Sequence, residues 1–123
     1  MEKRIKIGLW LVVISLFVLV GCNNKPNKDV QEVIDLIVLS VNDREDDYEY
    51  TEDDFSFKVY YSELLDIYMT HAFIPYKGES NRMDFLYSYH LKELERDGSI
   101  SQLPTILTEG NYEEVYRSGK FDD

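Results

Sequence analysis

The first twenty-two residues constrain this chain most strongly, because they have the layout of an export signal. Three basic residues precede a fourteen-residue apolar run over 7–20, and a polar segment follows at 23–28. A charged head, a short apolar run and a small-residue end are typical of a secretory signal peptide. The run is too short to cross a bilayer comfortably, since that takes about 20 apolar residues. We therefore interpret residues 1–21 as a cleaved signal and the remainder as an exported domain.

The end of the apolar run indicates how the exported domain is held. Leu19, Val20, Gly21 and Cys22 resemble the lipobox of bacterial lipoproteins, where a leucine, a small or branched residue and a small residue precede a cysteine. The resemblance implies cleavage between Gly21 and Cys22 and transfer of a diacylglycerol to Cys22. It also implies a location on the cell membrane, anchored by lipid and facing the extracytoplasmic side. The alternative is an uncleaved anchor ending in a buried free thiol.

The mature part has room for one acidic domain. The 123-residue chain has a net charge of −11, and removing 1–21 leaves 10 bases and 23 acids, a net charge of −13. A chain of this size forms a single domain, so we divide it into the signal at 1–21, the lipidated cysteine and tether at 22–28, and the domain at 29–123. Its charge repels nucleic acid and anionic lipid, which leaves a basic protein or a cation as the expected partner. An acidic surface that only maintains solubility is the alternative.

Periodicity predicts a mostly helical domain with a minor sheet. Asp29 and Glu32 have capping-box spacing, and five apolar residues follow at helical spacing, although a strand is the alternative because the run is rich in valine and isoleucine. The apolar positions of this first helix, 30–42, are Val30, Val33, Ile34, Ile37 and Val41. The alternation over 55–61 predicts a half-buried strand, which cannot stand alone. Its partner is expected to be 103–108, read as an extended segment, or the first apolar run.

Three further helices are expected beyond the strand. Ser62 is read as the cap of a helix that runs to residue 73. The clearest helical pattern covers 81–97, and a last short helix is expected over 111–119. The apolar stripe of the 81–97 segment comprises Met83, Leu86, Tyr87, His90, Leu91 and Leu94. The resulting fold class is α+β, a small and mostly helical domain after an N-terminal signal helix.

An acidic stretch at 43–54 is the main candidate site. Eight of its twelve residues are carboxylates, so it is expected to be a solvated, mobile loop that faces a basic partner. A calcium-binding loop is the alternative, but the sixth position of such a loop requires glycine and here holds Tyr48. Tyrosines are favoured at partner surfaces, and they suit a small core equally well. The candidate partner-binding residues are Asp43, Glu45, Asp46, Asp47, Tyr48, Glu49, Tyr50, Glu52, Asp53 and Asp54.

The sequence offers little for catalysis. His71 and His90 are the only histidines, and zinc takes at least three protein ligands, so His90 is expected to be a buried packing residue. Cys22 is the only cysteine, which excludes cysteine-type metal sites and an internal disulfide. No glycine-rich phosphate loop or Gly-x-Ser-x-Gly motif occurs. We therefore expect no cofactor, no metal and no enzymatic activity.

The layout as a whole indicates a protein-interaction module held at the outer face of the membrane. Small exported lipoproteins of this size include immunity factors against toxins and exclusion factors of phages and plasmids, and this chain is similar to them in layout. A positively charged toxin or channel would suit an acidic domain. The alternative is a ligand- or cation-binding lipoprotein, or a small hydrolase that uses a carboxylate pair.

Overall fold

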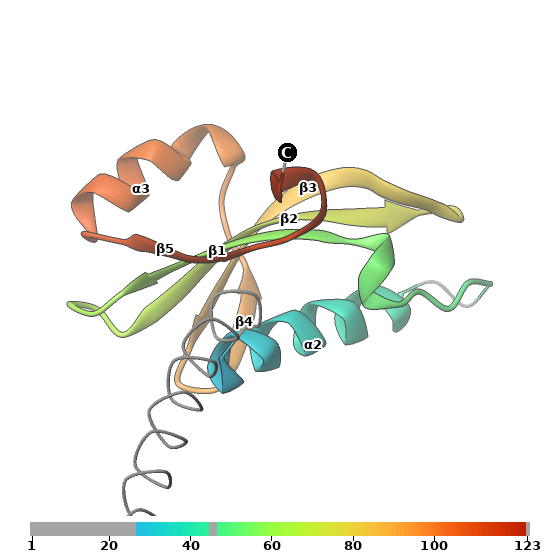
Figure 1. Cartoon of the computed structure of the whole chain (residues 1–123), viewed down its shortest axis with the longest axis horizontal. Helices are drawn as coiled ribbons and strands as arrows, with labels where there is room; N and C mark the ends of the chain where they lie inside the picture. The colour runs from blue at the N-terminus through green and yellow to red at the C-terminus, as the bar shows by residue number, and fades with distance from the viewer. Residues whose placement is uncertain (1–26, 45–46, 123) are drawn as a thin grey trace, which may run out of the picture.

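A computed structural model describes residues 27–44 and 47–122, which form one five-stranded antiparallel sheet with a helix against each face (Figure 1). The predicted signal and Cys22 lie outside the described residues. The strands are ordered β4-β3-β2-β1-β5 across the sheet. The elements in chain order are α2 (Lys28–Asn42), η1 (Glu52–Asp54), β1 (Ser56–Ser62), β2 (Ile67–Tyr76), β3 (Glu79–His90), β4 (Glu93–Arg96), η2 (Ile100–Gln102), α3 (Leu103–Glu109), β5 (Glu113–Arg117) and η3 (Gly119–Asp122).

Helix α2 confirms the predicted first helix and excludes the strand alternative. It begins earlier than expected, because its cap is Asn27, whose Oδ1 accepts a hydrogen bond from Val30 N at 2.8 Å. The predicted cap, Asp29, lies inside the first turn, where its negative charge favours the positive end of the helix dipole. The apolar positions predicted for this helix are all buried: Val30, Val33, Ile34, Ile37 and Val41.

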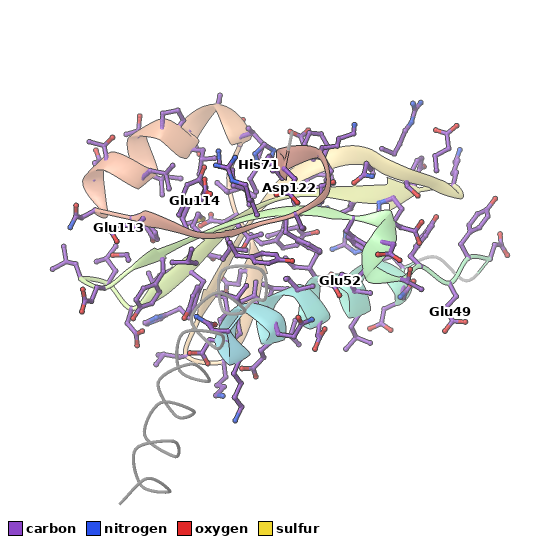
Figure 2. The ribbon with its side chains drawn as sticks, in the orientation of Figure 1. Glu49, Glu52, His71, Glu113, Glu114 and Asp122 are labelled. Carbon is purple, nitrogen blue, oxygen red and sulfur yellow. The ribbon has the colours of Figure 1, made fainter. Side chains whose placement is uncertain are left out.

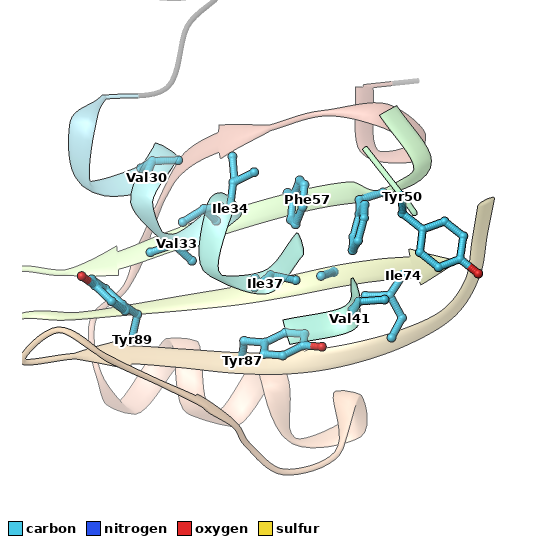
Figure 3. Close-up of a cluster of buried hydrophobic side chains, with 13 residues drawn as sticks. Val30, Val33, Ile34, Ile37, Val41, Tyr50, Phe57, Ile74, Tyr87 and Tyr89 are labelled. Carbon is cyan, nitrogen blue, oxygen red and sulfur yellow. The ribbon is translucent and has the colours of Figure 1, made fainter. Parts of the chain in front are cut away.

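The main core lies between α2 and the sheet (Figure 3). Burying a valine, leucine, isoleucine or phenylalanine side chain contributes about 1.5–3 kcal/mol, so this layer supplies most of the favourable free energy of folding. Sheet side chains of this layer alternate along each strand, as the two-residue period requires. The buried partners of α2 are Tyr50, Phe55, Phe57, Val59, Ala72, Ile74, Tyr87 and Tyr89.

A smaller core lies on the opposite face, under α3. Met69 and Leu86 point to this side and meet Leu103, the first residue of α3. Pro104 occupies the start of that helix, where its missing N–H is not needed. Partly buried residues complete the cluster: Tyr60, Ile100, Ile106, Leu107 and Tyr112.

The prediction of a mostly helical domain is wrong. The segment read as a helix from Ser62 to residue 73 forms the end of β1 and most of β2, and 81–97 forms β3 and β4. Conversely, the predicted extended segment 103–108 lies within α3, and the predicted last helix is β5 followed by η3. The central strands bury residues on both faces, so their apolar positions are not confined to every second residue and can match a helical period.

Strand β1 confirms the predicted half-buried strand, but its partners differ from those expected. It pairs antiparallel with β2 on one side, with Phe57 opposite Ala72, and with β5 on the other. Neither 103–108 nor the first apolar run joins the sheet. The β2–β3 hairpin turns through Lys77 and Gly78, whose φ angles of 49° and 81° suit the twist of a two-residue hairpin.

Candidate functional site

The end of the acidic stretch is held in a fixed turn next to the sheet. Thr51 N donates to Asp54 Oδ2 at 3.0 Å, which closes a capping box around η1. Ser80 Oγ donates to Asp54 Oδ1 at 2.6 Å and ties this turn to the start of β3. Glu52 and Asp53 occupy the same turn, and both are exposed. The sequence predicts a mobile loop for these carboxylates. In the structure, the hydrogen bonds of Asp54 fix the turn that carries Glu52 and Asp53.

Glu52 and Asp53 line a groove of about 360 Å³ between α2 and the end of β5 together with the residues that follow it. Gln31 borders it from α2, and Gln31 Nε2 donates to Asp35 Oδ1 at 2.9 Å on the next turn. Two aromatic side chains, one buried and one half-buried, form the apolar wall. The remaining lining residues are Phe55, Tyr116, Ser118 and Gly119.

The groove carries negative charge that is not neutralised. Partial burial raises the pKa of Glu52, and repulsion from Asp35 and Asp53 raises that pKa further, against a hydrogen bond from Gln31 that lowers it. Burial and repulsion from Glu52 also raise the pKa of Tyr116. Within the part of the chain that the structure describes, no lysine, arginine or histidine forms an ion pair with Glu52 or Asp53. The groove is therefore a place where added positive charge is favourable.

One carboxylate on the opposite face, that of Glu114, is neutralised by neighbouring cations. Arg117 donates from Nε and Nη2 to the two carboxylate oxygens of Glu114, at 2.7 and 2.6 Å, and Lys58 Nζ lies 3.5 Å from Glu114 Oε1. The hydrogen bonds from Arg117 lower the pKa of Glu114. Figure 2 shows Glu114 on the α3 side of the sheet and Glu52 on the α2 side. Glu114 thus already has cationic partners, whereas Glu52 keeps a negative charge with which a cationic ligand could pair.

The rest of the predicted acidic site is dispersed. Tyr50 is 6% exposed and belongs to the main core, which leaves it unsuited to contact a partner. Tyr48 is 46% exposed and stacks on Tyr50, with ring centroids 5.9 Å apart. Asp43 is the C-cap residue of α2, while Asp47 and Glu49 are exposed away from the residues that line the groove. Glu45 and Asp46 lie outside the described residues.

Sequence reasoning missed the second wall of the groove. Tyr116, Ser118 and Gly119 come from the segment read as a helix, so their meeting with Glu52 was not foreseen. The signal that could have found them is the run Tyr112 to Tyr116, which contains three residues that favour strands and is followed three residues later by the turn-forming Gly119.

Neither histidine lies where the helical reading placed it. His90 was expected on a buried stripe and is exposed, because β3 ends there and its Nδ1 donates to the carbonyl oxygen of Asp66 at 2.9 Å. His71 is half-buried on the α3 side, and its Nε2 lies 2.9 Å from Asp84 Oδ2. Phe73, two residues along β2, and Phe121 of η3 contact the His71 ring. His71 therefore acts as a packing and pairing residue beneath η3.

The described residues bring no three histidine, cysteine or carboxylate side chains together in a metal-binding group. No helix among them is long and apolar enough to cross a membrane.

Two carboxylates beside aromatic walls suit a basic side chain, arginine above all, because the guanidinium pairs with carboxylates and stacks on rings. No family model, curated protein or solved structure matches this chain.

Proposed function

We propose that this protein is a lipid-anchored module at the outer face of the cell membrane that binds a basic protein through the groove between α2 and β5. Its mode of action would be of the immunity or exclusion type, in which binding blocks or sequesters the partner. The observation that carries the proposal is the unneutralised pair Glu52 and Asp53 next to Phe55 and Tyr116.

A cationic side chain fits this groove for two physical reasons. An arginine between the carboxylates gains charge-assisted hydrogen bonds, and its planar face can stack on Tyr116. Its charge also relieves the repulsion that Asp35 and Asp53 exert on Glu52. Binding a cation would therefore lower the pKa of Glu52 and favour its ionised form, so affinity should fall when the pH drops low enough to protonate Glu52.

The net charge of the domain would speed the encounter with such a partner. A mature charge of −13 attracts a basic protein over about a Debye length, roughly 8–10 Å at physiological salt. Such attraction acts on any basic surface, whereas the groove would add a specific site formed by two carboxylates beside two aromatic side chains. Binding would thus combine a general, salt-sensitive attraction with a specific contact at Glu52 and Asp53.

The test is affinity capture with two charge-matched double variants of the full chain. One is Glu52→Gln with Asp53→Asn in the groove, and the other is Glu95→Gln with Glu109→Gln, at exposed positions on β4 and α3. Each removes two negative charges, so each weakens general attraction equally. We expect the wild type and the β4/α3 variant to retain the same basic envelope protein after detergent extraction, and the groove variant to lose it.

Equal capture by both variants would contradict the groove as the binding site. Loss of capture in both variants would show that only total charge matters, which also contradicts it. Repeating the wash at about 0.5 M salt distinguishes loosely held proteins, because screening shortens the range of charge attraction to a few ångström.

The lipid anchor has its own test. We expect a labelled fatty acid to be incorporated into the wild-type chain in a bacterial host and to be lost in Cys22→Ser, which should accumulate as the longer precursor. Two acyl chains on the diacylglycerol are enough for a stable anchor, where one is marginal. A wild-type membrane fraction without acyl label would contradict the anchor and leave the groove proposal standing.

A further inference from the structure

Exposed leucines gather at one end of the sheet. Leu64 is 74% exposed and Leu65 is 45% exposed in the turn between β1 and β2, and Leu91 is 78% exposed in the turn between β3 and β4. Strands β1 and β3 run in the same direction across β2, so both turns emerge at the same end. A cluster of large apolar side chains at the tips of two turns is a feature of surfaces that bind something apolar.

The same end of the domain receives the chain from the N-terminus. Tyr68 Oη lies 3.5 Å from Asp29 Oδ2 in the first turn of α2, and Lys92 Nζ lies 3.5 Å from Glu32 Oε2. A hollow of about 270 Å³ separates these elements, and Asp29 and Leu91 both line it. The first turn of α2 and the two leucine turns are therefore neighbours.

Local chemistry does not explain Leu91. Its φ is 50° and that of Lys92 is 66°, so both central residues of this hairpin turn adopt the left-handed conformation. Turns of this kind favour asparagine and glycine, because a branched side chain is strained there. Leucine is thus disfavoured at this position both by backbone conformation and by its contact with water. A ligand that buries Leu91 would account for its presence.

We propose that this end of the domain rests on the membrane, with Leu64 and Leu91 inserted at the level of the lipid headgroups. The inference rests on the proposed lipid anchor at Cys22. Six residues carry the chain from Cys22 to Lys28, a reach of at most about 20 Å. An acylated Cys22 would therefore hold α2 and its neighbouring leucine turns close to the bilayer surface.

The charges of this end decide which lipid it suits. Lys28 and Lys92 are accompanied by Asp29, Glu63 and Glu93, and Lys92 is already paired with Glu32. An excess of acids disfavours strongly anionic headgroups, so the leucines provide the attraction and zwitterionic lipid is the matching surface.

The docked orientation would leave the groove carboxylates free. Glu52 and Asp53 precede the first residue of β1, and Leu64 follows its last. The seven residues of β1 span about 20 Å, which separates the groove carboxylates from the leucine turns. The membrane would thus hold the domain with Glu52 and Asp53 turned away from the lipid and accessible to a partner.

The experiment measures how deep single positions lie in a lipid bilayer. The full lipidated chain is reconstituted into phosphatidylcholine vesicles that contain nitroxide-labelled lipid. Acylation uses the thiol of Cys22, the only native cysteine, so Leu64→Cys or Leu91→Cys supplies one free thiol for a fluorophore. Leu39→Cys is the matched control, because Leu39 is an exposed leucine at the other end of α2.

We expect the nitroxide to quench the labels at 64 and 91 about twofold or more relative to the label at 39, since interfacial side chains lie about 5–10 Å into the headgroup and acyl boundary. Quenching no greater than that at 39 in vesicles that carry the protein would contradict docking and leave the anchor intact. Failure of the protein to float with the vesicles would contradict the anchor, and docking with it. Circular dichroism confirms that each labelled variant is folded.

Discussion

The side chain of Asn42 forms hydrogen bonds with both the backbone N–H and the backbone carbonyl of Tyr50. Asn42 Nδ2 donates to the Tyr50 carbonyl at 3.0 Å, and Asn42 Oδ1 accepts from Tyr50 N at 2.8 Å. Asn42 thus pairs with the backbone of Tyr50 as a neighbouring strand would, and it fixes the position at which the acidic stretch returns to the core. Tyr50 Oη in turn accepts from Gly78 N at 2.9 Å, which links this point to the β2–β3 hairpin.

Replacing Asn42 with alanine should lower the free energy of unfolding by about 1–3 kcal/mol, because two partly buried backbone groups of Tyr50 lose their partner. Hydrogen exchange at the Tyr50 amide should speed up by more than exchange in β2. Asn42→Asp is the matched control, since it retains the acceptor for Tyr50 N and should protect that amide better than alanine does. Unchanged exchange at Tyr50 in Asn42→Ala would contradict the clamp.

Replacing Glu52 with glutamine should stabilise the fold at neutral pH. The raised pKa of Glu52 means that the folded state binds its proton more tightly than the unfolded state. The destabilisation by its charge is therefore complete at pH 7 and disappears as the pH falls through the raised pKa toward 4.5. Because Glu52 is exposed, screening limits the gain to about a few tenths of a kcal/mol. Urea unfolding at pH 7 and pH 4 measures this gain in unfolding free energy, and Glu109→Gln is the exposed control. A gain that is larger at pH 4 than at pH 7 would contradict the prediction.

Replacing Gly119 with alanine should lower the free energy of unfolding by about 1–3 kcal/mol. Its φ is 61°, and an added Cβ would collide with the side chain of the fully buried Ser56. Ser56 Oγ donates to Asn81 Oδ1 at 2.6 Å and accepts from Lys120 N at 2.8 Å, so a shift would also loosen η3. Gly98→Ala is the control, because its φ is 54° but the new Cβ would meet only the end of the flexible Gln102 side chain. Equal losses in the two variants would show that packing against Ser56 is unimportant.

Replacing Leu91 with asparagine should raise the free energy of unfolding by about 0.5–1 kcal/mol, because asparagine tolerates the left-handed conformation better. No buried contact is lost, since Leu91 is 78% exposed. Leu64→Asn is the control, as Leu64 is exposed without a positive φ. Thermal unfolding in solution checks both, and a loss of stability in Leu91→Asn would show that this side chain packs on the domain.

The sequence predicted α2 and β1 well, because the fully buried apolar residues of each lie on one side and therefore have a clear period. Phe57 and Val59 face the main core in alternation, as read from the sequence. The reading of β3 was wrong because Tyr87 and Leu86 are both buried, on opposite faces of the sheet. A strand covered on two sides loses its alternation, and the residues at 83, 86, 87, 90, 91 and 94 then also match a helix.

The site was predicted only in part, for a related reason. Charge density pointed to Glu52 and Asp53, which do line the groove. It could not distinguish them from Asp54, whose carboxylate is used within the fold, or show that Tyr50 is buried. Those distinctions depend on contacts with Ser80 and with Tyr116, which are distant in sequence and meet through the sheet.

Photo-crosslinking in living cells tests whether a basic protein binds at the groove. A photoreactive amino acid replaces Gln31, which borders the groove on α2, or Glu109 on α3 as the control on the opposite face. The full chain is expressed in the native bacterium and irradiated. We expect one basic envelope protein to be crosslinked from position 31, to be absent from position 109, and to be lost when Glu52→Gln and Asp53→Asn are added. A crosslink that forms equally from position 109, or that persists without the two carboxylates, would contradict binding at the groove.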